Sequence, residues 1–256
     1  MKKAITRALT IGLATAALSL AGCSTTSGTA TAPSAMARST TAPAATATTS
    51  TAAQGQSACT DLGGTIGPNG ICQVRSATPT YKIEMSFPID YPEMPAVAAF
   101  LKRDRDEFID WVATIGPHDG RNRPYQYAVT AKTYRSGKPD ARTQSLVLKI
   151  DNDTGFAHEG HPNTTFRAFN FDLAKHVPIT FDTLFKPGAK PLELLNPIVR
   201  AELDAPAADL DETTYQNFGI TDDAVIFFFG QDQVVHDNAG PHKVAVARIE
   251  LASMLS

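Results

Sequence analysis

The sequence lacks an excess of basic charge, and it lacks the glycine-rich motifs that hold nucleotides. Its 256 residues include 23 Lys and Arg against 26 Asp and Glu, for a formal net charge of −3. Proteins that bind nucleic acid need clustered Lys and Arg to neutralise phosphates. Neither G-x-x-x-x-G-K-[ST] nor G-x-G-x-x-G occurs in the chain. We therefore expect no nucleic-acid partner and no nucleotide chemistry.

The G-x-S-x-G elbow of many serine hydrolases is also missing. Catalytic triads are defined by geometry rather than by sequence order, so a serine and a histidine could still meet in space. The candidates are Ser86, Ser136, Ser145 and Ser253 with His161, His176, His236 and His242. A weak serine-type esterase of the cell envelope is therefore the alternative function, with no catalytic residue assigned.

The sequence contains no spacing of His, Cys, Asp and Glu that matches a known metal-binding motif. His158, Glu159 and His161 stand close together, but their spacing is not the helical H-E-x-x-H of metalloproteases, and a metal site needs at least three protein ligands. We interpret the histidines as loop residues bonded to local backbone. Asp151-Asn-Asp153 begins like a calcium loop but has no closing Glu at the required position, so a turn is the better interpretation. We expect no metal and no other cofactor.

Cysteine is scarce, and each of the three has a distinct context. A basic start (Lys2, Lys3 and Arg7) precedes an apolar run over 8–20, which is too short to act as a stop-transfer span. Leu-Ala-Gly-Cys follows, ending at Cys23. The pattern predicts a lipoprotein signal peptide over 1–22 and membrane attachment through lipid on Cys23, with a plain secretory signal as the alternative. The remaining pair, Cys59 and Cys72, is expected to form a disulfide in an oxidising compartment.

Val, Leu, Ile, aromatic and acidic residues are absent between Cys23 and Cys59. The segment 24–57 consists mainly of Ser, Thr, Ala, Pro and Gly, with Arg38 as its single charge. Such a segment buries too little apolar surface to offset the entropy of ordering. We therefore predict a disordered tether over 23–57 and one folded domain over 58–256, which is long enough for one sizeable core.

Periodicity within the domain predicts both strands and helices. Alternation of apolar and polar residues indicates strands, and apolar spacing of three and four indicates helices. Strands are expected at 81–87, 125–134, 144–151, 166–171, 220–229 and 242–248, and helices at 95–115, 191–203 and 249–255. Pro197 should start the second helix nearby or kink it. Because βαβ units do not alternate regularly, the order favours an α+β fold with a mainly antiparallel sheet and two main helices.

Several separated motifs from Cys59 to the C-terminus carry a family resemblance. They include GHPNTTFRAFNFD, PITFDTLF, YQNFGITDDAVIFFF and AGPHKVAV. In this order the chain resembles the mycobacterial secreted immunogenic MPT antigen family, which shares a domain type with the extracellular part of the lysozyme-sensing anti-sigma factor RsiV. The resemblance implies an exported α+β domain with a β-grasp-like sheet and no settled chemistry. His161 matches the family histidine, while His158-Glu159 replaces the paired glycines before it.

These observations together predict an exported, lipid-anchored protein at the extracytoplasmic face of the cell membrane, with some molecules released. We expect a binding or host-interaction module for a protein or cell-wall ligand. Loops on a rigid scaffold are the usual place for recognition, here over 155–165 and 231–242. The predicted ligand-binding residues are His158, Glu159, His161, Asn163, Tyr215 and His236.

Overall fold

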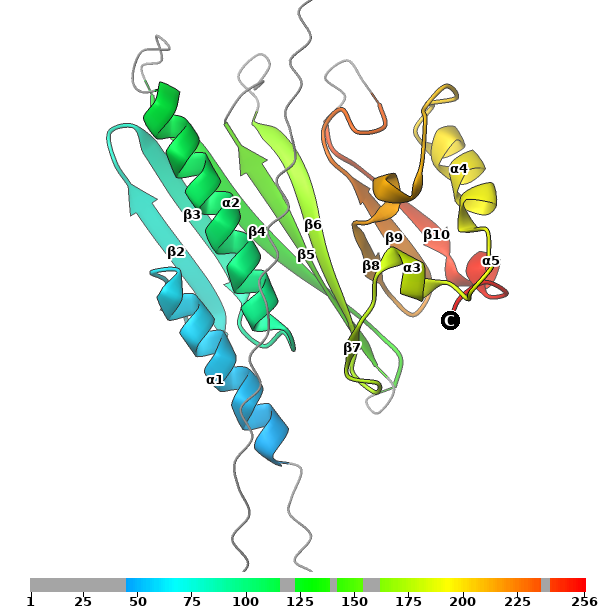
Figure 1. Cartoon of the computed structure of the whole chain (residues 1–256), viewed down its shortest axis with the longest axis horizontal. Coiled ribbons are helices and arrows are strands. Elements are labelled where there is room, and N and C mark those ends of the chain that lie inside the picture. The colour runs from blue at the N-terminus through cyan, green and yellow to red at the C-terminus, as the bar shows by residue number, and fades with distance from the viewer. Residues whose placement is uncertain (1–44, 116–122, 139–141, 154–161, 236–239) are drawn as a thin grey trace, which may run out of the picture. The chain divides into compact units, whose positions relative to one another are not determined.

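The alternating segments predicted near 81, 125 and 144 lie side by side in one sheet of seven strands (Figure 1). The structure is a computed structural model that describes residues 45–115, 123–138, 142–153, 162–235 and 240–256, all within one compact unit, 43–256. The predicted signal peptide, Cys23 and the first part of the predicted tether lie outside these residues. Within them, no helix is long and apolar enough to cross a membrane.

The seven strands follow one another across the sheet in chain order. All neighbours are antiparallel except β3 and β4, which run parallel and are connected through helix α2 (Met94–Ile115). The strands are β1 (Thr65–Ile66), β2 (Ile71–Ala77), β3 (Tyr81–Pro88), β4 (Tyr125–Ser136), β5 (Thr143–Asn152), β6 (Asn163–Asp172) and β7 (Val177–Pro178). The predicted α+β class with a mainly antiparallel sheet is confirmed.

Helix α2 covers one face of this sheet and builds the first core. Its apolar residues recur every three or four positions, so Val97, Leu101 and Phe108 point the same way and are fully buried. Leu146 and Leu148 of β5 face them in the same cluster. Successive side chains of a strand point to opposite faces. The odd-numbered residues of β5 are therefore left for a second layer.

Helix α1 (Ala45–Asp61) corrects the predicted boundary between tether and domain, because it starts well before residue 58. Ala is the strongest helix former, and tertiary contacts stabilise the small side chains of this segment. A Cβ added at Gly55 would lie 2.1 Å from the Ile89 carbonyl oxygen, so the helix backbone packs directly on the chain after β3. Ala58 and Leu62 are buried in the first core. Such contacts between distant segments are invisible in composition.

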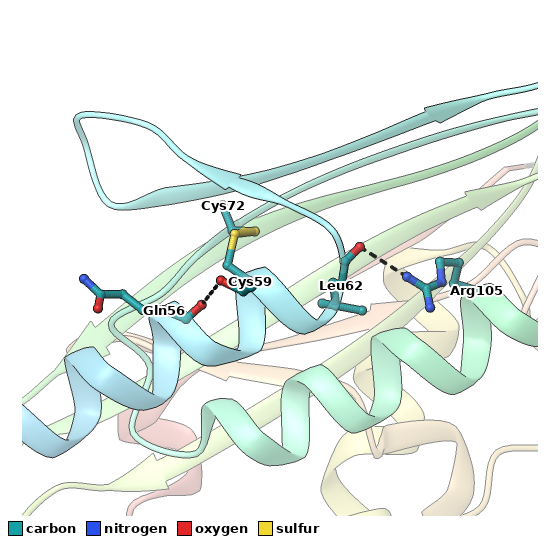
Figure 2. Close-up of a disulfide and its surroundings, with 6 residues drawn as sticks. Gln56, Cys59, Leu62, Cys72 and Arg105 are labelled. Atoms are coloured by element: carbon teal, nitrogen blue, oxygen red, sulfur yellow. Dashed lines mark hydrogen bonds between the residues drawn. A yellow bond between two sulfur atoms is a disulfide. The ribbon is translucent and has the colours of Figure 1, made fainter.

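The predicted disulfide between Cys59 and Cys72 is present and joins α1 to β2, with 5.7 Å between the two Cα atoms (Figure 2). Both cysteines are buried. Arg105 of α2 donates from Nη1 to the carbonyl oxygen of Leu62 at 3.2 Å. A cationic donor at the end of a helix satisfies a carbonyl that has no partner within the helix. The disulfide and the arginine together hold the end of α1 on the sheet and on α2.

A second sheet of three strands holds the densest apolar run of the chain, at its centre. The strands are β8 (Phe218–Ile220), β9 (Ala224–Phe229) and β10 (His242–Ala247), in the order β10-β9-β8. Four short helical elements accompany them: α3 (Phe181–Leu184), α4 (Pro191–Glu202), the 3-10 helix η3 (Glu212–Tyr215) and α5 (Arg248–Leu251). Helix α4 starts at Pro191 and continues through Pro197, and Leu195 and Val199 are buried on either side of that residue.

Two hydrophobic clusters therefore replace the single core expected from chain length. The seven-stranded sheet separates them, because β8 and β9 pack on the face opposite α2. The ring of Phe228 contacts those of Tyr134 and Phe166, with centroids 5.8 and 5.3 Å apart. Ser145 of β5 accepts a hydrogen bond from the Ile220 backbone N–H at 3.0 Å. Aromatic packing and a buried polar contact thus join the two sheets.

Candidate functional site

Most of the predicted ligand-binding residues fall outside the part of the chain that the structure describes. His158, Glu159, His161 and His236 are among these. Asn163 is described: it is half-buried and is the first residue of β6, opposite Asn152 of β5. Asn163 therefore belongs to a strand rather than to the loop predicted over 155–165.

Tyr215 belongs to the second core, which corrects its prediction as a ligand-binding residue. It has no exposed surface, and its ring stacks on Phe181 and meets Phe227 edge-on. Its hydroxyl donates to Asn196 Oδ1 at 2.8 Å. Burial raises the pKa of Tyr215 to about 12. The polar neighbours of Tyr215 in sequence indicate a surface position, but its ring fills the space between α3 and β9.

The two segments predicted to carry recognition meet at their described ends. The backbone N–H of Gln231, just after β9, donates to the carbonyl oxygen of Thr164 in β6 at 2.8 Å. Gly230 is pressed against the same strand, since a Cβ there would lie 3.1 Å from that oxygen. Gln233 accepts from the Gly230 N–H at 2.8 Å and holds the turn in place. The start of β6 and the end of β9 therefore lie side by side, and we call these residues the loop junction (Asn152, Asn163, Thr164 and Gln231).

An ion pair and a short hydrogen bond support the junction from β5. Asp151 accepts from the Thr164 hydroxyl at 2.6 Å and from the Lys149 ammonium at 2.8 Å. Next to it, Asp153 is buried and pairs with Arg123 at 3.3 Å. Strand β5 continues through Asn152, so Asp151 is a strand residue rather than part of the predicted turn. The carboxylates are neutralised by these partners, and the junction carries mainly amide groups for hydrogen bonding.

The serines weighed for a hydrolase occupy different environments. Ser136 and Ser145 are buried, and their hydroxyls contact Thr143 at 2.6 Å and the Ile220 N–H at 3.0 Å. Ser86 is half-buried in β3, and Ser253 is exposed. Among the hydrogen bonds of the described residues, none joins a serine hydroxyl to His176 or His242. The other histidines considered, His161 and His236, lie outside those residues.

The described residues contain no group of three or more His, Cys, Asp or Glu residues that could hold a metal ion.

The sequence offered no signal that Thr164 and Gln231 would meet, because their proximity arises only when β9 packs on β6. The pairing of Lys149 with Asp151 follows strand alternation, which places both side chains on one face, and this could have been anticipated.

Comparison with known proteins assigns the chain to a family. Residues 182–248 match the family described as a protein of unknown function (DUF3298). Solved structures of DUF3298 proteins from Pseudomonas aeruginosa PAO1 and Bacteroides fragilis NCTC 9343 are each 13% identical, with TM-scores of 0.48 and 0.46. The alignments cover 74% and 73% of this chain and 95% and 92% of those chains.

Curated proteins found by sequence comparison share a higher sequence identity with this chain than the two solved structures do. The chain is 41% identical over 200 residues to Esterase Rv3036c of Mycobacterium tuberculosis, covering 75% of this chain and 86% of that protein. It is 37% identical over 207 residues to the immunogenic proteins MPB64 of Mycobacterium bovis and MPT64 of Mycobacterium tuberculosis, covering 77% of this chain and 88% of each relative. The chain therefore belongs to the family of mycobacterial proteins that includes MPT64, MPB64 and Rv3036c.

Proposed function

We propose that this protein is an exported binding module of the cell envelope, tethered to the membrane by lipid on Cys23 and recognising a cell-wall or protein ligand. The observation that carries the proposal is the loop junction, where Gln231 is bonded to Thr164 on the edge of a sheet. The buried disulfide fits an oxidising compartment outside the cytoplasm. The relatives named as immunogenic proteins support an exported, antigen-like role. Common descent with the RsiV extracellular domain is part of the same proposal.

The chemistry of the junction favours an uncharged polar ligand. Asn163 and Gln231 carry amide groups, each with two donors and an acceptor, while Lys149 and Asp151 neutralise each other. Paired amides suit the hydroxyl and amide groups of a cell-wall polysaccharide or a peptide. We therefore choose isolated cell-wall sacculi as the first probe.

Replacing both Asn163 and Gln231 with Ala should weaken binding to sacculi roughly 5- to 150-fold, because two hydrogen bonds of ordinary strength are lost. Cosedimentation of the purified protein with sacculi measures the change. The matched control replaces two exposed amides on α1 and β2, Gln56→Ala with Gln73→Ala, and should bind like the native protein. If the native protein does not cosediment, or if both double variants bind equally, the proposed surface is wrong.

Ester hydrolysis is the second candidate, because a relative that is 41% identical is named as an esterase. It would need a serine and a histidine that come together. The test is turnover of p-nitrophenyl butyrate by the native protein and by single Ala variants of His158, His161, His176, His236 and His242. An esterase should lose about 10²- to 10⁴-fold in kcat when its general base is removed.

The pH profile provides an independent check on the esterase. Activity that depends on a neutral histidine should rise with pH through about 6.5, the ordinary pKa of that side chain. Turnover that stays unchanged in all five variants would exclude an esterase that uses one of these five histidines. A rate that does not vary with pH between about 5 and 8 would exclude a histidine-based esterase altogether. The binding proposal would be unaffected by that result.

A further inference from the structure

A pocket of about 470 Å³ lies at the other end of β6 from the loop junction. Both sheets contribute to it: Thr143 and Asp172 come from β5 and β6, and Ile220 and Val225 come from β8 and β9. Chain segments after β6 and at the C-terminus supply the rest of its lining. Its volume falls within the range of about 300–1,000 Å³ that small-molecule sites occupy.

The greater part of the lining is apolar. Ile179 follows β7, Leu184 belongs to α3 and Leu255 lies near the C-terminus, and all three line the pocket beside Ile220 and Val225. Ile220, Val225 and Leu184 are themselves buried in the second core, so the walls are held by packing. A ligand with a hydrocarbon body would remove this surface from water, which is favourable in proportion to the apolar area covered.

The charged side chains of the lining are two cations and one carboxylate, and Ser256 adds the terminal carboxylate of the chain. Asp172 already has its partners: it accepts from the backbone N–H groups of Ala174 and Lys175, both at 2.9 Å, and pairs with the Lys175 ammonium at 3.5 Å. Burial alone would raise the pKa of the Asp172 carboxyl, but these donors and the ammonium hold its pKa below the ordinary value. The opposite charges of Asp172 and Lys175 therefore balance each other.

Arg248 of α5 is the charged side chain of this lining that lacks an ionic partner among the described residues. Its Nη1 donates to the carbonyl oxygen of Thr221 at 3.2 Å, and no ion pair joins it to a carboxylate anywhere in the described residues. The nearby Asp222 instead accepts from the Gly137 N–H at 2.7 Å. A guanidinium has five N–H donors. The half-buried Arg248 can therefore direct further guanidinium N–H groups to a ligand at the wall of this apolar pocket.

We propose that this pocket binds an amphipathic monocarboxylate, such as a medium-chain fatty acid, with its carboxylate on Arg248 and its chain along Ile179, Leu184 and Val225. A neutral ligand would cover the guanidinium without giving it a charged acceptor, which costs free energy. A cationic ligand would be repelled. A dianion would meet the carboxylates of Asp172 and of the chain end with only one unpaired cationic side chain to balance it. The site goes beyond the proposed envelope function and shares no residue with the loop junction.

The test is isothermal titration of the purified full chain with decanoate, decanol and decyltrimethylammonium, each below its critical micelle concentration. Decanoate should bind saturably and more tightly than decanol, and decyltrimethylammonium should not bind. Arg248→Gln should weaken decanoate binding about tenfold or more, because a charge-assisted hydrogen bond is lost. It should change decanol binding about twofold at most, since the alcohol makes no such charge-assisted bond.

Two further variants keep the test decisive. Arg248→Lys retains the cation and should recover most of the decanoate affinity, while Lys243→Gln removes an exposed cation from β10 outside the pocket and should bind as the native chain does. Thermal unfolding by circular dichroism verifies that each variant is folded. The proposal is overturned if decanoate binds no better than decanol, or if Arg248→Gln and Lys243→Gln bind decanoate equally well. Neither result bears on cosedimentation with sacculi, so the two proposals fail separately.

Discussion

Replacing Cys59 and Cys72 together with Ala is expected to lower the free energy of unfolding by about 3 kcal/mol. The two residues are 13 positions apart, and a cross-link over a loop of this size removes conformational entropy from the unfolded chain. For a domain of some 200 residues the melting temperature should fall by roughly 6–12 °C. Differential scanning calorimetry of the two proteins measures both quantities.

The contacts around the disulfide indicate that its removal should loosen the end of α1 in addition to lowering the stability of the whole domain. A Cβ on Gly64 would lie 2.5 Å from Cys72 Sγ and 2.8 Å from Cys59 Sγ, so the chain folds tightly over the sulfur atoms. Without the bond, the end of α1 keeps Arg105 as a partner through the Leu62 carbonyl oxygen. We expect backbone N–H groups of α1 to exchange with solvent faster than those of α2.

Treatment with dithiothreitol provides the matched control for the disulfide. The native protein should lose stability on reduction and approach the double variant, whereas the double variant should not respond. A double variant that melts at the native temperature would show that the cross-link contributes nothing to stability.

Replacing Phe227 with Ala should cost about 3–5 kcal/mol, the largest loss that we expect from a single substitution. Phe227 is on the central strand β9 and is 0% exposed. Its ring meets those of Tyr215 and Phe218, with centroids 5.3 and 6.1 Å away. The cavity left by the ring would be bounded by other large side chains that cannot collapse into it. The melting temperature should fall by roughly 6–20 °C.

Trp111, the only tryptophan in the chain, turns this substitution into a test of how the two cores are coupled. Its ring packs on Tyr125 beside the first core, 5.1 Å between centroids, while Phe227 lies in the second. Because Phe228 and Ser145 join the sheets, Trp111 fluorescence and far-ultraviolet circular dichroism should shift together in the variant. Ile249→Ala, at a residue that is 83% exposed, should change stability by no more than about 0.5 kcal/mol. A Trp111 fluorescence transition that stays at the melting temperature of the native protein would show that the two cores unfold independently.

Local patterns in the sequence determined most of the individual elements. Alternation from Tyr81 and from Tyr125 predicted two strands of the large sheet, because one face of each strand is buried while the other is mainly exposed. The three- and four-residue spacing from Val97 to Val112 predicted α2 for the equivalent reason in a helix. The number and context of the cysteines predicted the Cys59–Cys72 bond, and the run over 224–229 predicted a central strand.

Tertiary structure alone decided what depends on contacts between distant segments. Helix α1 forms in a segment of tether-like composition because Gly55 and Ala58 pack against the domain. Tyr215 is buried because α3 and β9 close around it, although its sequence neighbours are polar. The loop junction and the Arg248 pocket each join residues that are far apart in the chain. Local periodicity does not predict which strand ends will meet. Burial on both sides of a sheet, rather than chain length, divided the interior into two cores.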